Sequence, residues 1–381
     1  MNILKICYEY PPLGGGGGHV VKGLSNQLIQ QGHNVDLITM MYKGLKQIEI
    51  KNSLSIYRIR CIRSDSIICH PHEMLSYQLS ALPKALMLTR KKRYDIIHAH
   101  FIFPDGVLAC LLSKLTGIPY LITAHGSDVP GYNPDRFINM HSIIAPLWKA
   151  IVRSSSTMVC LSQYLESLLK KAIPCANSTI IPNGFPIGRF RSDRPKLNRI
   201  LIVTRMFKRK GIQHFLHAID GLNLNHEIHI VGDGPYLNEL KQQAKSLSAH
   251  INFHGFVNND SEHFSELMET SKIFVLPSVS ENFPISLLEA MDAGMAIITT
   301  RHTGCAEVVG NAGSLVNPGD YKAIRHELIR LTENPALCKI LGNKARKRLD
   351  ANFSWQSVAD QYIQTYQEII GKKITRPAMP N

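Results

Sequence analysis

The sequence predicts an α/β protein built from two Rossmann-like domains. Short apolar runs of strand length alternate with stretches of helical periodicity along almost the whole chain. Five consecutive glycines follow the first apolar run, as expected where a strand-to-helix turn binds a nucleotide. The alternation pauses at residues 185–197, rich in Pro, Gly and Arg, and then begins again. A chain of 381 residues can hold two such domains, which we place at residues 1–190 and 191–354.

The first domain opens with a strand, a glycine loop, a helix and a second strand. We expect these elements at residues 2–8, 14–18, 19–31 and 34–39. Glycine lets a backbone approach a ligand closely. However, the second strand does not end in the acidic residue that binds a ribose in many dinucleotide-binding folds, and so a flexible turn is the alternative interpretation of the glycine loop.

The rest of the first domain continues the alternation. We expect strands at residues 54–61, 95–99, 120–124, 157–160 and 179–181, and helices at residues 74–92, from 105 onward, and 162–172. The helix at 74–92 carries leucines on one face and ends among four consecutive basic residues. It fits either a membrane-surface element or a core-facing helix whose cations stabilise its carboxyl end.

The net charge of +14 is concentrated in the first half of the chain. Residues 1–190 contain 20 Lys and Arg against 10 Asp and Glu, whereas residues 191–381 contain 23 against 19. A basic half predicts anionic partners, namely phosphates, an anionic membrane surface or nucleic acid. The chain has no zinc-ligand spacing, no aromatic–basic RNA motif and no basic recognition helix, and so we expect no nucleic acid partner.

The N-terminus and the cysteines favour a cytoplasmic protein. The first eight residues predict a strand instead of a signal peptide, and the apolar runs are too short to span a membrane. The eight cysteines are scattered, without a Cys-x-x-Cys pair, as expected for reduced thiols. Together with the basic half, this predicts a cytoplasmic protein with peripheral attachment to the inner face of a membrane.

Polar residues follow the predicted strand at 120–124. They are His125, Gly126, Ser127 and Asp128. The carboxyl ends of parallel strands are where doubly wound sheets bind ligands. A lone histidine is usually structural, but His125 is better placed for ligand binding than most of the 17 histidines.

The second domain repeats the alternation. We expect strands at residues 199–204, 227–231, 251–254, 273–276 and 296–299, two helices after residues 302–306, and a last helix at residues 354–370. Arg205 ends the first of these strands, and Lys210 follows in a basic turn. Gly232, Asp233 and Gly234 follow the second strand. By itself, the basic turn fits an ordinary solvated surface.

A helix start follows the strand at 273–276. We expect the helix to begin at Pro284, because proline at the first helical position has no N–H to leave unbonded. The backbone N–H groups of Ile285, Ser286 and Leu287 then point out of the helix, where its dipole favours an anion.

Two glutamates flank this helix start. Glu281 precedes it and Glu289 lies about one turn inside the helix. Carboxylates accept hydrogen bonds from sugar hydroxyls, and so an anion-binding site between two of them suits a phosphorylated sugar. The alternative is an ordinary helix whose acidic residues complement its dipole.

These motifs occur together in one order along the chain. The set comprises the glycines at 14–18, the His-Gly-x-Asp of 125–128, the Pro-Asn-Gly of 182–184, Arg205 with Lys210 and Gly211, the Gly-Asp-Gly-Pro of 232–235, and Glu281 with Glu289. As a set they resemble the retaining nucleotide-sugar glycosyltransferases of the GT-B fold, the large group also called family four. The likeness covers about residues 1–370.

The resemblance implies an architecture and a reaction. Two domains face each other across a cleft, the donor binds mainly to the second domain, and a C-terminal helix at 355–381 crosses back to complete the first. The reaction implied is hexosyl transfer, with retention, from a nucleotide-diphosphate sugar to a lipid-linked, polysaccharide or other glycan acceptor.

The resemblance also implies roles for single residues. Arg205 and Lys210 hold the donor diphosphate and act in catalysis. Glu281 contacts the transferred sugar near the reacting carbon, and His125 faces it from the first domain. Glu289 binds the ribose. The further donor-binding positions are Gly16, Gly17, Gly18, Gly232, Phe256, Val257, Ile285, Ser286 and Leu287, and the acceptor-side positions are Gly15, His19 and Asp128.

The chemistry of the leaving group agrees with this assignment. A nucleoside diphosphate gains charge as it leaves, and cations or helix N–H groups aimed at it stabilise the transition state. The chain contains no Asp-x-Asp, so we expect no metal on the diphosphate and no cofactor beyond the nucleotide-sugar co-substrate. Asn282 and Pro284 stand where the family often has glycine, which leaves the identity of the sugar open.

Two other functions fit the same architecture. A nucleotide-sugar epimerase would convert the donor without an acceptor. A non-catalytic nucleotide-sugar-binding partner would show no turnover, although Arg205, Lys210, Glu281 and Glu289 are all present.

Overall fold

The structure, a computed structural model, describes residues 1–66, 68–132 and 134–374 and divides the chain into two compact units. Unit 1 contains residues 1–184 and the chain from Trp355 onward, and unit 2 contains residues 185–354. Residues 185–190, which the sequence placed in the first domain, group with unit 2. Hydrogen bonds explain this: the Phe185 N–H donates to the Phe353 carbonyl at 2.8 Å, and the N–H groups of Gly188 and Phe190 donate to the Asp292 carboxylate at 2.9 and 2.7 Å.

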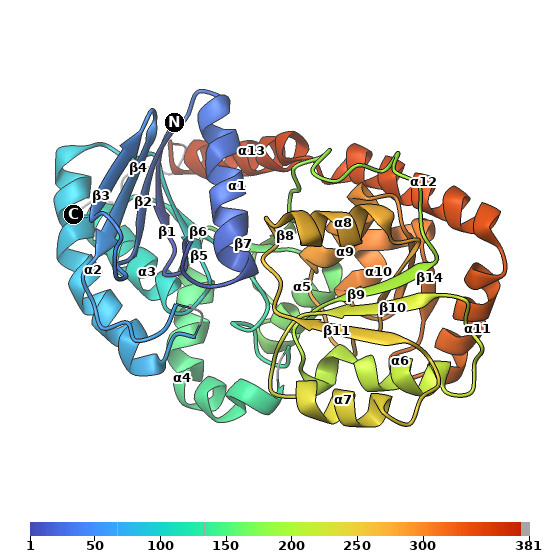
Figure 1. The fold of residues 1–381 in the computed structure, drawn as a ribbon. Coiled ribbons are helices and arrows are strands. Elements are labelled where there is room, and N and C mark those ends of the chain that lie inside the picture. The colour runs from blue at the N-terminus through green and yellow to red at the C-terminus, as the bar shows by residue number, and fades with distance from the viewer. Residues whose placement is uncertain (67, 133, 375–381) are drawn as a thin grey trace. The chain divides into compact units, whose positions relative to one another are not determined.

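Unit 1 is built on an eight-stranded sheet in the order β3-β4-β2-β1-β5-β6-β7-β8 (Figure 1). Neighbouring strands are parallel except for the antiparallel pair β3–β4. The strands are β1 (Asn2–Ile6), β2 (Asn34–Met40), β3 (Ile48–Lys51), β4 (Leu54–Ile59), β5 (Ile96–His100), β6 (Tyr120–Ala124), β7 (Thr157–Cys160) and β8 (Ser178–Ile180). The sequence did not predict β3, because this edge strand has only four residues and its apolar side chains, Ile48 and Ile50, are exposed.

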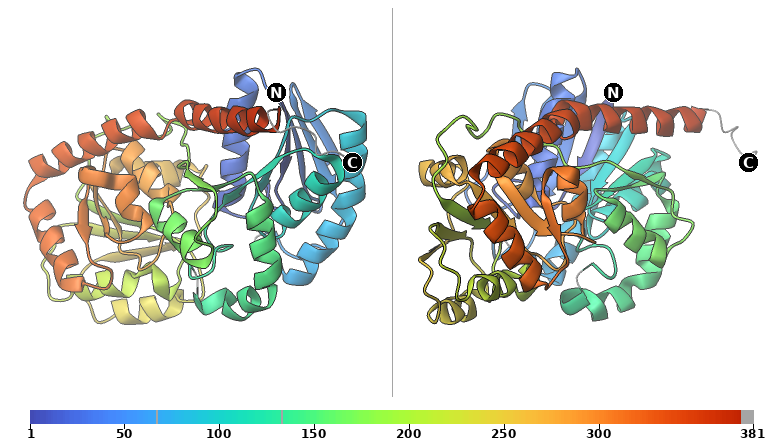
Figure 2. Two further views of the ribbon diagram at one scale, coloured as in Figure 1. Left: turned by 180° about the vertical axis from the view of Figure 1, so that it is seen from behind. Right: turned by 90° about the vertical axis from the view of Figure 1, so that its right-hand side faces the viewer.

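Six helices belong to the described part of unit 1. They are α1 (Gly16–Gln30), α2 (Pro71–Lys91), α3 (Asp105–Thr116), α4 (Pro134–Ser154), α5 (Gln163–Ala172) and α13 (Trp355–Ile374). The C-terminal helix α13 packs against α1, as Figures 1 and 2 show. Gly23 permits this approach, since a Cβ at that position would lie 2.2 Å from the Trp355 ring. The predicted continuation of this helix over 375–381 lies outside the described residues.

The sequence predicted that all five glycines belong to a loop, but the structure places three of them in a helix. Helix α1 begins at Gly16, so that Gly16, Gly17 and Gly18 form its first turn and Gly15 is its N-cap residue. Only Gly14 needs the left-handed backbone region, with φ of 81°. Gly18 is required for a different reason, because a Cβ there would lie 3.0 Å from the Glu9 carbonyl oxygen.

Unit 2 contains a six-stranded parallel sheet in the order β11-β10-β9-β12-β13-β14. The strands are β9 (Arg199–Val203), β10 (Glu227–Val231), β11 (Ile251–Gly255), β12 (Ile273–Leu276), β13 (Ala296–Thr300) and β14 (Ser314–Val316). The last strand, β14, has only three residues and was not predicted.

The helices of unit 2 are short except for the last two. They are η1 (Lys208–Lys210), α6 (Ile212–Ile219), α7 (Leu237–Ala244), α8 (Glu262–Thr270), α9 (Ile285–Asp292), α10 (Gly304–Val309), η2 (Gly310–Ala312), α11 (Tyr321–Thr332) and α12 (Pro335–Asn352). The sequence predicted two helices after residue 302, whereas the structure has the three α-helices α10, α11 and α12. The shortest of them, α10, is only six residues long.

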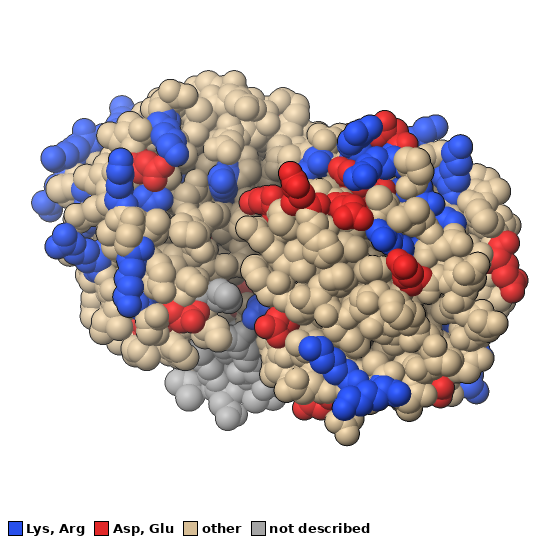
Figure 3. Space-filling view, in the orientation of Figure 1, with Lys and Arg blue, Asp and Glu red and all other residues tan. Residues whose placement is uncertain are grey.

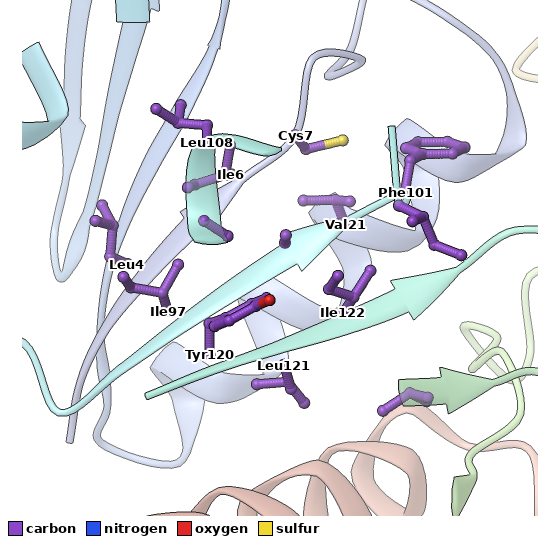
Figure 4. Packing of buried hydrophobic residues seen from close by; sticks show 14 of the residues in the cluster. Leu4, Ile6, Cys7, Val21, Ile97, Phe101, Leu108, Tyr120, Leu121 and Ile122 are labelled. Carbon is purple, nitrogen blue, oxygen red and sulfur yellow. The ribbon is translucent and has the colours of Figure 1, made fainter. Parts of the chain in front are cut away.

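Each unit has its own apolar core around its sheet. In unit 1 the strand residues Leu4, Ile6, Ile97, Leu121 and Ile122 are completely buried, and Figure 4 shows them packed between neighbouring strands and helices. Such burial on both faces is typical of parallel sheets and explains why the strands were recognisable as continuous apolar runs. Within the described residues, no helix combines the length and the apolar character needed to cross a membrane.

Candidate active site

The loops at the carboxyl ends of β9 and β10 are held together by glycines. Gly232 and Gly234 have φ of 133° and 154°. A Cβ on Gly232 would lie 1.9 Å from the Thr204 carbonyl oxygen, and a Cβ on Gly234 would lie 2.5 Å from that of Met206. These contacts fix the backbone on both sides of Arg205, whose exposed guanidinium lies 5.1 Å from the Phe207 ring centroid.

Lys210 and Glu281 form a buried ion pair at the carboxyl end of the sheet. Lys210 ends the short helix η1 after β9, and Glu281 lies in the loop after β12, so that two adjacent strands bring them together. They are 8% and 6% exposed. The Ser278 hydroxyl donates a further hydrogen bond to Glu281 Oε1 at 3.1 Å. Burial lowers the pKa of Lys210, and the Glu281 carboxylate opposes that shift.

The loop that carries Glu281 is anchored by backbone contacts. The Val279 N–H donates to the Arg209 carbonyl at 2.8 Å, and Arg209 Nη1 donates to the Ser280 carbonyl at 3.2 Å. On its other side, the Gly304 N–H donates to the Glu281 carbonyl at 2.9 Å. Glu281 is therefore fixed through its main chain as well as through its side chain.

Glycine is needed at two contacts around this pair. A Cβ on Gly211, whose φ is 73°, would lie 2.0 Å from the Pro277 carbonyl oxygen. A Cβ on Gly304 would lie 1.3 Å from the carbonyl oxygen of Asn282. The segment 302–306 therefore supplies one close-packing glycine.

The start of α9 differs from the prediction in two details. Pro284 is the N-cap residue, with ψ of 122°, and not the first helical residue. The Leu287 N–H is not free, since it donates to the Pro284 carbonyl at 3.2 Å, which removes Leu287 from the predicted set of free amides. Ile285 and Ser286 occupy the first helical positions and are half-buried. Phe256 follows β11 and is 75% exposed, and Val257 beside it is half-buried.

Glu289 is buried in α9 and forms an ion pair that the sequence did not suggest. Its Oε1 lies 3.2 Å from Nη1 of Arg189, near the start of unit 2, and its side chain is 3% exposed. Burial raises the pKa of Glu289 to about 7, while Arg189 lowers it. Sequence reasoning assigned residues 185–197 only to a linker. It missed Ser278, which bonds to Glu281 three residues along the same loop, and Arg209, whose contacts join separate loops.

Unit 1 brings His125, Gly17 and Phe101 together at the carboxyl ends of β5 and β6. The rings of Phe101 and His125 have centroids 4.5 Å apart. A Cβ on Gly17 would lie 2.7 Å from Cζ of Phe101 and 3.7 Å from Nδ1 of His125. Phe101, labelled in Figure 4, has φ of 78°, an unfavourable conformation for a residue with a side chain that directs its ring toward α1.

His125 is the outer member of a row of three histidines. Its Nε2 shares a hydrogen bond of 3.2 Å with Nδ1 of His100, and the His100 ring stacks on His98 with centroids 4.1 Å apart. His98 in turn bonds to the Tyr366 hydroxyl of α13 at 2.6 Å. Burial lowers the pKa of His125 to about 3, so that its imidazole is neutral at physiological pH.

Asp128 and His19, both predicted on the acceptor side, differ in burial. Asp128 is buried, and its carboxylate accepts hydrogen bonds from the N–H groups of His125, Gly126 and Ile102 at 3.1, 2.9 and 2.8 Å. Asp128 thus shapes the loop that carries His125. His19 is exposed in α1, one turn after Gly15.

Comparisons with known proteins identify the family. Residues 14–189 match the family described as Glycosyltransferase Family 4, and residues 188–348 match the family Glycosyl transferases group 1. The chain belongs to this family of retaining glycosyltransferases. The chain is therefore an enzyme, and its sugar donor is a nucleotide sugar, the donor class of this family.

Several known proteins resemble this chain over nearly its whole length. An uncharacterized glycosyltransferase of Methanocaldococcus jannaschii is 26% identical, over 98% of this chain and 100% of the relative. Among solved structures, a sucrose-phosphate synthase from Thermosynechococcus elongatus has a TM-score of 0.81 at 21% identity, covering 97% of this chain and 99% of that one. An Anabaena protein solved in complex with UDP has a TM-score of 0.76 at 18% identity, over 97% and 100% of the two chains. These two structures establish the GT-B fold.

Proposed function

We propose that this glycosyltransferase moves a sugar, with retention, from a nucleotide-diphosphate donor held by unit 2 to a lipid-linked, polysaccharide or other glycan acceptor. The observation that carries the proposal is the buried Lys210–Glu281 pair beside the first turn of α9. A buried ion pair adds little net stability compared with apolar side chains, and so its presence at the carboxyl edge of the sheet favours a functional reason.

Lys210 is suited to bind a diphosphate. In the free protein its ammonium is neutralised by Glu281 and is shielded from water. A donor diphosphate would offer it a second counter-charge, which strengthens as the bond to the sugar breaks and negative charge collects on the phosphate. Arg205, on the loop after β9, is exposed and can reach the same anion with its fork of N–H donors.

Glu281 would contact the transferred sugar. One of its oxygens accepts bonds from Lys210 and Ser278, which leaves lone pairs of the carboxylate for sugar hydroxyls. Ile285 and Ser286 add N–H groups at the start of α9, and Glu289 would accept hydrogen bonds from the ribose. We assign Gly232, Phe256 and Val257 to the surroundings of the nucleotide.

Unit 1 would contribute a neutral surface for sugar hydroxyls. His125 can donate or accept a hydrogen bond without adding charge, because its imidazole is neutral. We assign Gly16, Gly17 and Gly18, in the first turn of α1, to donor binding, and Gly15, His19 and Asp128 to the acceptor side.

A second feature of unit 1 favours a lipid surface. Helices α2 and α3 pack together and expose Leu75, Leu79, Leu111 and Leu115, which are 56%, 69%, 42% and 63% exposed. Figure 3 shows Lys and Arg side chains gathered over the part of the surface formed by unit 1. Exposed apolar side chains on a basic unit suit an anionic membrane surface, which supports a lipid-linked acceptor. The eight unpaired cysteines support placing this reaction in the reducing cytoplasm, at the inner face of a membrane.

Liposome pelleting tests this attachment. Pelleting with anionic vesicles should fall as salt rises, because salt screens surface charges. Leu75→Ser combined with Leu79→Ser should reduce it further at constant salt. Equal pelleting with neutral vesicles, or no pelleting with anionic vesicles, would contradict the membrane assignment.

The transferase assignment is tested with a panel of nucleotide-diphosphate sugars. UDP sugars come first, because the structurally similar Anabaena protein was solved with UDP. A thermal-shift screen identifies the donor, since a ligand at 100 times its Kd adds about 2.7 kcal/mol to the free energy of unfolding. Product analysis with glycan and lipid-linked acceptors then measures transfer. Acceptor-independent conversion of the donor sugar would instead identify an epimerase, and binding without turnover would identify a non-catalytic partner.

A further inference from the structure

The ion pair between Arg189 and Glu289 carries an inference about the nucleotide site. Among the described residues, Arg189 is the only cation paired with the buried Glu289 carboxylate, at 3.2 Å. Arg189 lies near the start of unit 2, in the segment that the sequence assigned to a linker, and Glu289 lies in α9. The two residues are 100 positions apart in the sequence, so that the fold must bring them together.

Arg189 is fixed from several directions. Its Nη2 donates to the Asn259 carbonyl at 2.7 Å and lies 3.4 Å from the Asp260 carboxylate. Its guanidinium lies 4.9 Å from the ring centroid of Phe190, which is buried. These contacts hold the arginine independently of Glu289, and so the guanidinium acts as a fixed charge toward the glutamate.

The backbone around Arg189 is fixed as well. The N–H groups of Gly188 and Phe190, one on each side of it, both donate to the Asp292 carboxylate, at 2.9 and 2.7 Å. Asp292 is one turn after Glu289 on α9 and pairs with Arg346 of α12 at 3.0 Å. The linker is therefore pinned to the helix that carries the glutamate.

Two negative charges face Glu289 and favour its neutral form, and Arg189 opposes them. Asp260, in the loop after β11, and Asp292, on α9 itself, both raise its pKa, as burial does, whereas Arg189 lowers it. A protonated carboxyl keeps fewer acceptor sites and gains a donor. Without Arg189, Glu289 would therefore lose acceptor capacity at neutral pH.

We propose that Arg189 is a positioning residue that holds the Glu289 carboxylate aimed and charged, so that it accepts hydrogen bonds from the ribose hydroxyls of the donor nucleotide. The inference rests on the proposed function, which places the ribose at Glu289. Arg189 itself need not touch the nucleotide. It gives the linker segment a part in donor binding that its position in the sequence does not suggest.

Calorimetric titration with UDP, ADP and GDP identifies the nucleotide that binds the wild type. The affinity for that nucleotide is then measured between pH 6 and 9. For the wild type, affinity should fall as the pH drops through about 7, where Glu289 takes up a proton. In Arg189→Ala this midpoint should move upward by about one pH unit, and the affinity at pH 7 should fall about fivefold and recover toward pH 9. Arg189→Lys, which keeps the cation, should retain a midpoint near that of the wild type.

Two matched variants control the measurement. Arg191→Ala removes an exposed arginine from the same segment, one that pairs with Asp193, and should leave both the affinity and the midpoint unchanged. Glu289→Gln cannot ionise, so that any pH dependence it retains belongs to the nucleotide and is subtracted. Arg189→Ala should cause no further loss in the Glu289→Gln background.

The outcomes separate the inference from the proposed function. If the wild type binds no nucleoside diphosphate, the proposed function is wrong. If the wild type binds one and a folded Arg189→Ala protein keeps its affinity and midpoint, the role of Arg189 alone is wrong. If Arg189→Ala does not fold, the comparison of Arg189→Lys with Arg189→Gln decides, since only the lysine variant should keep the wild-type midpoint.

Discussion

The two units handle charge in opposite ways at the ends of their sheets. In unit 2, Lys210 pairs with Glu281 and Arg189 pairs with Glu289, so that full charges are buried against each other. In unit 1, the neighbouring side chains are stacked imidazoles, and burial lowers the pKa values of His98, His100 and His125. The buried Asp128 carboxylate beside them is bonded to backbone N–H groups instead of to a cation. Charged groups that remain buried need fixed partners, whereas neutral groups need only hydrogen bonds.

This contrast suggests a division of labour between the units. Unit 2 keeps cations and carboxylates in place before a ligand arrives, which suits a charged nucleotide diphosphate and the charge that develops on it. Unit 1 offers uncharged imidazole and backbone groups, which suit the hydroxyls of a sugar or glycan. Substitutions in the two units should therefore affect nucleotide binding and turnover differently.

The largest effect is expected at Glu281. Glu281→Gln keeps the shape of the side chain but removes the charge beside the transferred sugar, and kcat should fall about 100- to 1000-fold. Nucleoside diphosphate affinity, measured by calorimetry, should change only a few-fold, because the nucleotide is expected elsewhere. A folded Glu281→Gln protein with near-normal transfer would remove Glu281 from the chemistry.

The next effect separates the two diphosphate cations. Lys210→Ala and Arg205→Ala should each weaken nucleoside diphosphate binding, and lower kcat/KM at least as much, by about 10- to 150-fold, the equivalent of a hydrogen bond to a charged group. Only Lys210→Ala should also lower the stability, by about 3–5 kcal/mol, because it leaves Glu281 buried without its partner. Arg205 is exposed, so its loss should leave the melting temperature nearly unchanged.

Denaturant unfolding and calorimetry on both variants measure the difference. Lys210→Met provides a control that refills the space of the lysine stem. An Arg205→Ala protein that binds the nucleotide unchanged would contradict the diphosphate site, whatever the result for Lys210.

A smaller effect is expected in unit 1. Gly17→Ala places a Cβ 2.7 Å from Cζ of Phe101, and displacement of that ring should shift His125. We expect kcat to fall about tenfold, since small misplacements near reacting groups are costly. Nucleoside diphosphate affinity should stay unchanged, because the nucleotide binds to unit 2.

The double variant Gly17→Ala with Phe101→Leu tests this cause. A smaller side chain at 101 relieves the contact, and turnover should recover relative to Gly17→Ala alone. If nucleotide affinity falls together with kcat, the division of labour between the units is wrong.

The strands of both units could be predicted from the sequence because buried parallel strands are continuous apolar runs. The short edge strands β3 and β14 could not: β3 exposes its apolar side chains, and β14 has only three residues. At the candidate site, Lys210 and Glu281 could be identified from the resemblance of the ordered motifs to a known family. Their mutual ion pair could not, because it depends on the adjacency of β9 and β12, whose residues are some 70 positions apart.

Arg189 shows a second limit of sequence reasoning. An arginine in a predicted linker carries no local pattern, and it is placed beside Glu289 by long-range contacts, among them the backbone hydrogen bonds from its neighbours to Asp292. The glycines at 16–18 show a third, since a glycine run predicts a loop by propensity while tertiary contacts place these three residues in a helix.

The smallest effect is expected from removal of divalent metal ions. If Lys210 and Arg205 supply the positive charge that the leaving diphosphate requires, no metal ion is needed there. The chain contains no Asp-x-Asp, and the described residues include no group of three His, Cys, Asp or Glu side chains that could hold a metal. Transfer measured in excess EDTA should therefore equal transfer in magnesium or manganese.

Lys210→Ala gives the informative comparison: if added magnesium restores part of its activity while the wild type is unaffected, the lysine provides the charge that a metal can replace. If EDTA abolishes wild-type transfer and magnesium or manganese restores it, the diphosphate is held by a metal, and the contrast between a charged unit 2 and a neutral unit 1 does not account for catalysis.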